Sequence, residues 1–271
     1  MRFLLEPEDG ATAAALVAAG EAAHRAGLDG VLLTDGAGPG SALVAAAVLA
    51  GAVPDVLIAV ETALGDRHPL EVAEEAAVVD VASGGRLVLV ARPAPGAEQD
   101  YPEALDLLRT AWTPRPFCAD GPRWPVPARL PGNVNQVEQR VRMTPAPARP
   151  RLELWGAGAG MAAATHRALG AIADPDADPD ALAALWRDAG AAVGPAALGA
   201  PRARRERWID APALRARLLA GRRAFGQDWA AVRAPADAAD AIGREVRPHV
   251  QLERLPDGLG DHWAGGGSPP C

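Results

Sequence analysis

The feature that most constrains the fold of this chain is an alternation of short apolar runs with Ala-rich amphipathic stretches over residues 2–112. The stretches repeat apolar residues every three or four positions, which is typical of helices that bury one face. A strand followed by a helix, repeated about every 30 residues, indicates a parallel sheet with crossover helices. The predicted strands of this half are Arg2–Glu6, Val31–Thr34, Val56–Glu61 and Leu87–Ala91.

The turn after the first strand distinguishes between the main kinds of parallel sheet. No Gly-x-Gly-x-x-Gly motif occurs there, which argues against a dinucleotide-binding Rossmann domain. Repeated units without that motif favour a closed barrel, in which functional residues follow the carboxyl ends of the strands. This rule selects Asp35, Glu61 and Arg92 as candidate functional residues.

The clearest single helix follows the third strand. Pro69 is suited to a first helical position, because its φ is fixed and it has no N–H to leave unpaired. Ser83-Gly84-Gly85 ends the helix. The whole block, HPLEVAEEAAVVDVASGGR followed by LVLVARP, resembles the signature of the bacterial luciferase-like monooxygenase superfamily.

This resemblance implies an α/β fold of the (β/α)8 TIM-barrel type. It also implies an oxidoreductase that uses flavin mononucleotide (FMN) or the deazaflavin coenzyme F-420 for hydride transfer or monooxygenation of a small organic molecule. Members of the superfamily commonly pair as homodimers through helices early in the chain, and a flavin reductase would be a partner if FMN is used. The Lys-free, Ala-rich composition is typical of GC-rich coding, as in actinobacteria, where the deazaflavin is common.

The second half of the chain is predicted with fewer signals. We expect a single barrel domain over 1–255, with 113–150 forming a long loop over the barrel mouth, either as a lid or as surface wrapping, and a flexible tail at 256–271. The Arg-rich stretch 202–207 is predicted to be a solvated face. Because relatives are usually longer here, the barrel is expected to be shortened or incomplete. The predicted strands are Arg151–Trp155, Ala171–Asp174, Glu206–Ile209 and His249–Leu252.

A glycine-rich turn after the fifth predicted strand is a candidate anion site. Turns of this kind present several backbone N–H groups to a ligand. The resemblance implies that this turn, with Arg92, holds the cofactor phosphate, whereas glycines also serve tight turns and a strand-end arginine is often paired at the surface. The predicted cofactor-binding residues are Ala59, Val60, Arg92, Gly156, Gly158, Ala159 and Gly160.

Two carboxylates are candidate catalytic residues. Glu61 is predicted to line the ring pocket or act as a general base, or else to be an exposed loop carboxylate. Asp35 stands where relatives have an acidic residue followed by histidine, but Gly36 follows it here. The missing histidine supports an alternative in which the protein binds no cofactor and serves as a structural or partner subunit. An unrelated α/β binding domain is a further alternative.

Charge and composition exclude several other functions. A net charge of -7 argues against general nucleic-acid binding, which needs a basic surface. Cys118 and Cys271 match no metal-binding spacing and no disulfide framework. No apolar stretch reaches the roughly 18 residues needed to span a membrane, and the N-terminus has no signal-peptide pattern. These features predict a cytoplasmic protein without a bound metal.

Overall fold

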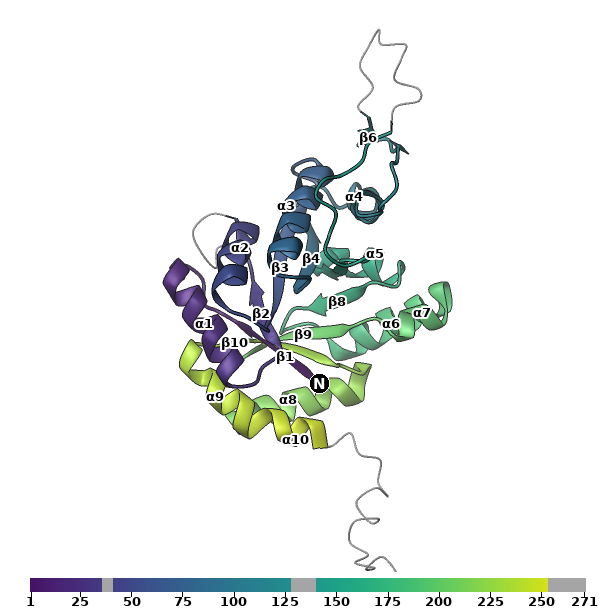
Figure 1. Cartoon of the computed structure of the whole chain (residues 1–271). Helices are drawn as coiled ribbons and strands as arrows, with labels where there is room; N and C mark the ends of the chain where they lie inside the picture. The colour runs from purple at the N-terminus through teal and green to yellow at the C-terminus, as the bar shows by residue number, and fades with distance from the viewer. Residues whose placement is uncertain (36–40, 128–139, 253–271) are drawn as a thin grey trace, which may run out of the picture.

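The computed structural model, which describes residues 1–35, 41–127 and 140–252, contains a closed barrel of eight parallel strands (Figure 1). Each strand pairs in parallel with both neighbours, and β1 pairs with β10 to close the ring. The order around the barrel is β1-β10-β9-β8-β7-β4-β3-β2. The strands are β1 (Arg2–Glu6), β2 (Gly30–Leu33), β3 (Leu57–Leu64), β4 (Leu87–Pro93), β7 (Glu153–Ala157), β8 (Gly170–Ala173), β9 (Arg202–Arg207) and β10 (Trp229–Arg233).

Helices surround the strands, and neighbouring helices pack against one another (Figure 1). The helical layer closes where α1 meets the C-terminal helices. The longer helices are α1 (Ala13–Arg25), α2 (Ala42–Ala52), α3 (Pro69–Ala82), α4 (Tyr101–Ala111), α6 (Pro179–Val193) and α8 (Ala211–Phe225). The shorter helical segments include α5 (Met161–Thr165), α7 (Pro195–Leu198), α9 (Ala239–Ala241) and α10 (Arg247–Leu252). No helix within the described ranges is both long and apolar enough to cross a membrane.

Most strands are buried on both faces, which explains the continuous apolar runs in the sequence, and β9 is the exception. Side chains that point outward pack against the helices, and those that point inward fill the barrel. The barrel interior contains Trp155 and Trp229, whose rings meet edge to face at 5.0 Å between centroids. With few aromatic residues in the chain, the rest of the interior consists of Ala, Val, Leu and Ile.

The helix predicted after the third strand is confirmed. His68 is its N-cap, and its Nδ1 accepts a hydrogen bond from the backbone N–H of Leu70 at 3.2 Å. Pro69 occupies the first turn, and Ser83 is the C-cap. Arg86 then holds β4 against the preceding unit, because its guanidinium donates to the backbone carbonyls of Ala50, Val53, Val56 and Ser83.

The structure corrects the last two predicted strands. The seventh strand is Arg202–Arg207 rather than Glu206–Ile209, and the eighth is Trp229–Arg233. His249–Leu252 instead lies at the end of α10. The eighth strand escaped the prediction because its sequence, WAAVR, is short and contains two alanines, which are weak strand formers.

The expectation that the C-terminal half is incomplete is also wrong, since all eight strands are present and the barrel closes. The Arg-rich stretch is not a solvated face. Glu206 has no exposed surface, and Arg204 and Arg205 are largely buried side chains. Strand pairing places these residues alternately inside the barrel and against the helices, where buried partners compensate their charges.

The long segment between α4 and β7 contacts α3 and α4 where it is described. The Glu103 carboxylate of α4 accepts hydrogen bonds from the backbone N–H groups of Arg123 and Trp124. Near the end of the segment, buried Asp80 of α3 accepts from the N–H groups of Ala148 and Arg149. The segment includes the short pair β5 (Ala119–Asp120) and β6 (Pro125–Val126), whereas 128–139 and the predicted tail 256–271 lie outside the described residues.

Candidate active site

The carboxyl end of the barrel, which we call the mouth, is formed by charged side chains. The period-two alternation of a strand explains the position of all of them except Asp35, which follows the end of β2, because each of the others follows an inward-facing apolar residue two positions earlier. Thus Glu6 follows Leu4, and Glu61 follows Ala59. The charged residues at this end are Glu6, Asp35, Glu61, Arg92, Asp174, Arg205 and Arg233.

Arg205 crosses the full width of the mouth. It lies on β9, and its guanidinium forms a close ion pair with Glu61 on β3, four strands away around the ring and therefore opposite. The same guanidinium lies 3.9 Å from Glu6 on β1 and 3.8 Å from Asp174 after β8. The ion pair between Arg205 and Glu61 therefore spans the mouth from one side to the other.

Arg92 forms the rim above this pair. Its Nε lies 3.3 Å from Glu61 Oε1, and its Nη2 lies 3.7 Å from Asp35 Oδ2. The Arg92 side chain is 36% exposed and that of Glu61 only 10%. The structure thus brings together Asp35, Glu61 and Arg92, the three residues selected by the strand-end rule, and Arg92 is the cation among them, with a side chain that solvent reaches.

Burial raises the pKa of the two glutamates beneath the rim, Glu6 and Glu61. Desolvation raises the pKa of Glu61 above its usual value, against the opposing effects of Arg205 and Arg92. Desolvation likewise raises the pKa of Glu6, with Arg205 and Arg233 opposing it. Two buried carboxyl groups that share one guanidinium can exchange a proton with a bound substrate more readily than exposed carboxylates can.

The glycine turn lies beside Arg92. Residues Gly158–Gly160 form a short 3-10 turn in contact with β4, and Gly156 is paired with Ala91. A Cβ on Gly156 would lie 2.4 Å from Ala164, and one on Gly160 would lie 2.6 Å from the Tyr101 ring, so both glycines serve close packing. Gly158 has a positive φ of 54° and open space beside it.

The turn is therefore open to a ligand at two positions. Gly158 and Ala159 are exposed, whereas Gly156 and Gly160 are buried. The helix that follows, α5, has five residues, so its dipole contributes little to an anion site here. Any anion held at the turn depends on the backbone N–H groups of Gly158 and Ala159 and on Arg92.

Two predicted cofactor residues are not brought to the mouth by their side chains. Ala59 lies inside the barrel one layer below Glu61, and it has no exposed surface. Val60 points outward into the layer between barrel and helices and is equally buried. A strand turns successive side chains to opposite faces, so Val60 cannot share the direction of Glu61.

Sequence reasoning missed Glu6 and Arg205. The strand-end rule that selected Glu61 applies equally to Glu6, the last residue of the first predicted strand, so this residue could have been found. Arg205 was hidden, because four arginines in six positions are typical of a solvated face. Arg205 shares the inward face of β9 with Ala203, and this can be recognised only when the bounds of the strand are known.

Fold and mouth together define a (β/α)8 TIM-type barrel with charged groups at the carboxyl end. Solved structures that resemble it include the monooxygenase RslO1 from Streptomyces bottropensis, with a TM-score of 0.73 and 15% identity over 92% of this chain and 99% of that one. A second is the oxygenating constituent of 3,6-diketocamphane monooxygenase from Pseudomonas putida, in complex with FMN, with a TM-score of 0.68 and 15% identity over 92% and 98% of the two chains.

A third neighbour is the coenzyme F420-dependent tetrahydromethanopterin reductase from Methanopyrus kandleri, with a TM-score of 0.66 and 12% identity over 92% of this chain and 99% of that one. These likenesses confirm the predicted (β/α)8 TIM-type barrel fold. No protein-family profile matches the sequence. No curated protein matches it at the sequence level either.

Proposed function

We propose that the chain is an oxidoreductase that uses a flavin or a deazaflavin to act on a small organic molecule at the mouth. The observation that carries this proposal is the position of Arg92, an accessible cation at the end of β4 beside the open turn of Gly158 and Ala159. The fold supports it, because one neighbour is in complex with FMN and another depends on coenzyme F420.

The residues of the mouth fit a phosphate-bearing cofactor. Arg92 offers a guanidinium, and the Gly158–Ala159 turn offers backbone N–H groups without a side chain in the way at Gly158. The polar edge of a flavin-type ring can accept from Arg205 or pair with the Glu61 carboxyl group. When bound, such a ring supplies hydride transfer or, with FMN, the activation of oxygen.

The protein's own groups have distinct tasks in this proposal. Arg92 neutralises the phosphate or a substrate carboxylate. Glu61, whose pKa is raised by burial, holds or accepts a proton at its carboxyl oxygens and acts as general acid or base. Arg205 is a positioning residue, because its ion pair fixes Glu61 over the barrel axis. If FMN is the cofactor, a separate flavin reductase would supply its reduced form.

Titration of the protein with FMN, reduced FMN and coenzyme F-420, followed by fluorescence, tests this proposal. We expect one of them to bind at micromolar concentrations. Arg92→Ala should weaken that binding by about tenfold or more, because a charge-assisted contact to phosphate is lost. Arg207→Ala is the matched control, since this exposed arginine has no partner for its guanidinium among the described residues. Equal affinity in both variants would contradict the proposed role of Arg92.

One observation favours a second function, that of a subunit without cofactor. All three arginines of the mouth are already paired with carboxylates: Arg92 with Asp35 and Glu61, Arg205 with Glu61, and Arg233 with Asp9. A phosphate would have to displace a carboxylate from Arg92. Failure of all three cofactors to bind in the titration would reject the oxidoreductase and leave this second function.

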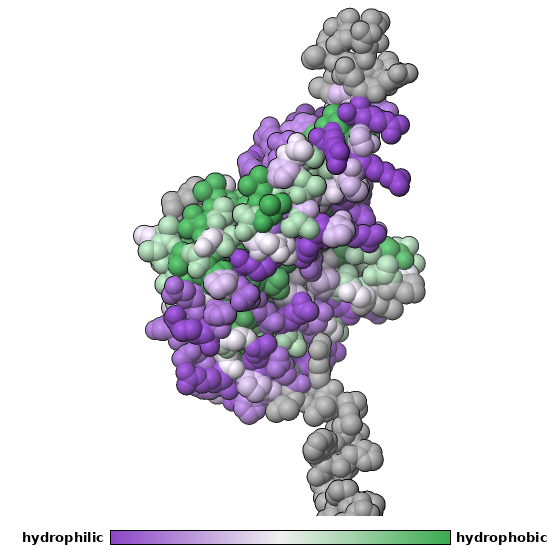
Figure 2. Space-filling view, viewed as in Figure 1, coloured by the Kyte–Doolittle hydropathy of each residue, from purple (hydrophilic) through white to green (hydrophobic). Residues whose placement is uncertain are grey.

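We also propose that two copies of the chain pair through α2 and α3. Four of the five exposed large hydrophobic side chains of the described residues lie on these adjacent helices, and each is between 46% and 58% exposed. They are Val44 and Val48 on α2 and Val78 and Val81 on α3. The apolar patch is visible over α2 and α3 in Figure 2. Because α2 has no charged residue, its uncovered face fits an identical apolar face.

Light scattering after gel filtration tests the homodimer. We expect twice the chain mass for the natural protein. Val44→Asp with Val78→Asp should give the mass of one chain, because burying two carboxylates in an apolar interface is strongly unfavourable. Ile209→Asp is the control, since Ile209 is the fifth exposed hydrophobic and lies elsewhere. A natural protein with the mass of one chain would overturn the proposed dimer.

A further inference from the structure

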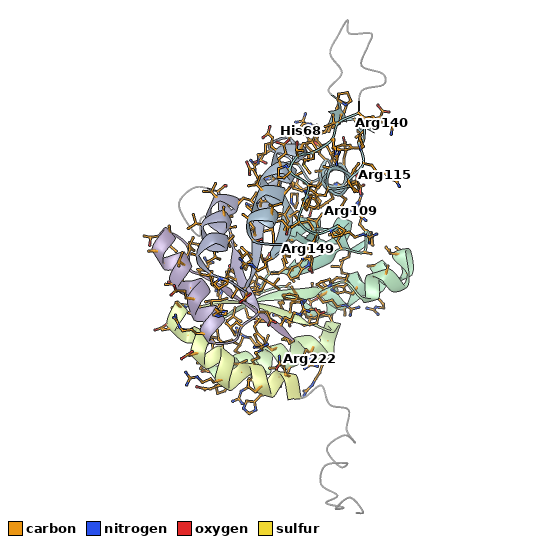
Figure 3. All side chains as sticks on the ribbon, in the orientation of Figure 1. His68, Arg109, Arg115, Arg140, Arg149 and Arg222 are labelled. Carbon is orange, nitrogen blue, oxygen red and sulfur yellow. The ribbon has the colours of Figure 1, made fainter. Side chains whose placement is uncertain are left out.

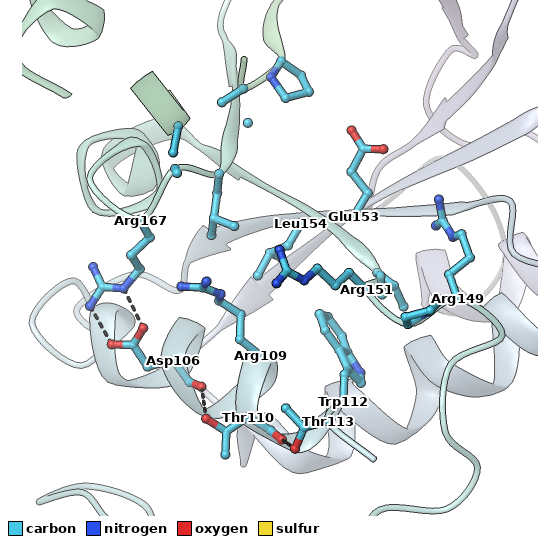
Figure 4. A pocket seen from close by; sticks show the side chains of 18 of the residues that line it. Asp106, Arg109, Thr110, Trp112, Thr113, Arg149, Arg151, Glu153, Leu154 and Arg167 are labelled. Atoms are coloured by element: carbon cyan, nitrogen blue, oxygen red, sulfur yellow. Dashed lines mark hydrogen bonds and ion pairs between the residues drawn. The ribbon is translucent and has the colours of Figure 1, made fainter. Parts of the chain in front are cut away.

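A large basic cavity lies at the opposite end of the barrel from the mouth. It has a volume of about 870 Å³ and opens between the end of α4, the residues before β7 and those before β8 and β9 (Figure 4). Its charged lining comprises Arg109, Arg149, Arg151, Arg167, Asp106 and Glu153. Nothing in the chemistry proposed for the mouth uses this cavity, because catalysis in such barrels occurs at the carboxyl ends of the strands.

Two of the four arginines already have partners. Arg167 on the turn after α5 forms a bidentate pair with Asp106 of α4, at 2.8 and 2.7 Å. Arg149 lies 3.3 Å from Asp80 and donates to the backbone carbonyl of Leu87. These two side chains hold the walls of the cavity together, so they are structural.

Arg109 and Arg151 are different. Their guanidinium groups point into the same space from opposite walls (Figure 4), and neither has a hydrogen bond or ion pair within residues 1–35, 41–127 and 140–252. Two guanidinium groups that face a common space repel each other unless an anion lies between them. This arrangement is therefore poised to bind an anion.

The two acidic residues that line the cavity do not neutralise Arg109 and Arg151. Both oxygens of Asp106 accept from Arg167. Glu153 accepts from the indole N–H of Trp155 at 2.8 Å and points away from Arg151 (Figure 4). Each carboxylate is thus held by another donor.

Most of the remaining lining is apolar. Leu154 and Leu169 contribute side chains, and Trp112 presents the edge of a ring whose N–H is bound to the carbonyl of Ala73 at 3.0 Å. Apolar walls beside two exposed cations, unpaired within the described part of the chain, suit a ligand with an anionic group on an apolar or aromatic body. We propose that this cavity binds a small organic anion, a phosphate or carboxylate, through Arg109 and Arg151.

Isothermal titration calorimetry of the full chain tests the site with three probes: phenyl phosphate, phthalate and phenol. We expect the natural protein to bind at least one anionic probe and not phenol, and to lose affinity as ionic strength rises. Which of phenyl phosphate and phthalate binds more tightly identifies phosphate or carboxylate as the preferred group. The double variant Arg109→Ala, Arg151→Ala should weaken that binding by about tenfold or more.

The matched control is Arg115→Ala with Arg140→Ala, which removes two exposed arginines of the long segment that do not line the cavity (Figure 3). This variant has the same net charge as the double variant and should bind like the natural protein. Absence of binding by both anionic probes overturns the proposal. Equal weakening in the two double variants overturns it as well, because binding would then follow net charge rather than this cavity. Cofactor binding at the mouth is unaffected by either result, so the two proposals fail separately.

Discussion

Replacement of Arg205 by methionine is expected to lower the free energy of unfolding by about 3–5 kcal/mol at neutral pH, because it leaves buried carboxylates without their cation. Arg205 is the close partner of Glu61 and lies 3.9 Å from Glu6, and the side chains of these glutamates are 10% and 4% exposed. Arg92 still contacts Glu61 in the variant, whereas Glu6 keeps only the more distant charge of Arg233. Denaturation by urea, followed by circular dichroism, measures the loss.

The pH dependence of this loss identifies its cause. Burial already raises the pKa of Glu6 and Glu61 above 4.5, and removal of Arg205 takes away the largest opposing charge. A carboxyl group whose folded-state pKa is raised binds a proton more tightly in the folded state, so stability falls as pH rises above the unfolded pKa. Arg205→Met should therefore cost more at about pH 8 than at about pH 5.

Two further variants complete this experiment. Glu6→Gln added to Arg205→Met should recover part of the lost stability, because one buried charge disappears. Arg207→Met, at an exposed position on the same strand, should change stability by less than about 0.5 kcal/mol. A loss that does not depend on pH and is not recovered by Glu6→Gln would show that Arg205 contributes packing rather than charge.

The first half of the barrel could be predicted because its physical signals are local. Each of the first four strands is a short apolar run, and the helix Pro69–Ala82 has both a start and an end signal. The second half could not be predicted in the same way. The strand Arg202–Arg207 consists mainly of charged residues, and such a sequence is typical of an exposed segment. The strand Trp229–Arg233 is short and contains two alanines, so its sequence does not indicate a strand.

Part of the candidate site could also be predicted from local signals in the sequence. The rule that function follows strand ends depends only on where strands end, so it brought Asp35, Glu61 and Arg92 together correctly. It gave no information about partners from the opposite side of the barrel. The contact of Arg205 with Glu61 joins residues 144 positions apart in sequence, and no local pattern encodes such a pair. The cavity lined by Arg109 and Arg151 likewise depends on the closed barrel.

The interior of the barrel gives the second large expected effect. Trp155 has no exposed surface, fills the space between the strands and meets the ring of Trp229 at 5.0 Å. Apart from Trp229, the core around it is built from small aliphatic residues, so the space that a missing indole leaves can be filled only in part. Trp155→Ala should therefore destabilise the protein by about 3–5 kcal/mol. Differential scanning calorimetry should show a melting temperature lower by roughly 10 °C.

Trp155→Phe separates ring volume from hydrogen bonding in the same experiment. Phenylalanine keeps most of the buried ring but loses the N–H that donates to Glu153 at 2.8 Å. Because Glu153 is only half-buried and can reach water, this loss should be about 1–2 kcal/mol, clearly smaller than that of the alanine variant. If Trp155→Ala and Trp155→Phe were equally unstable, the hydrogen bond rather than the filled volume would hold the interior together. If both variants melted at the temperature of the natural protein, the Trp155 side chain would not be needed to fill the barrel interior, and the prediction would be wrong.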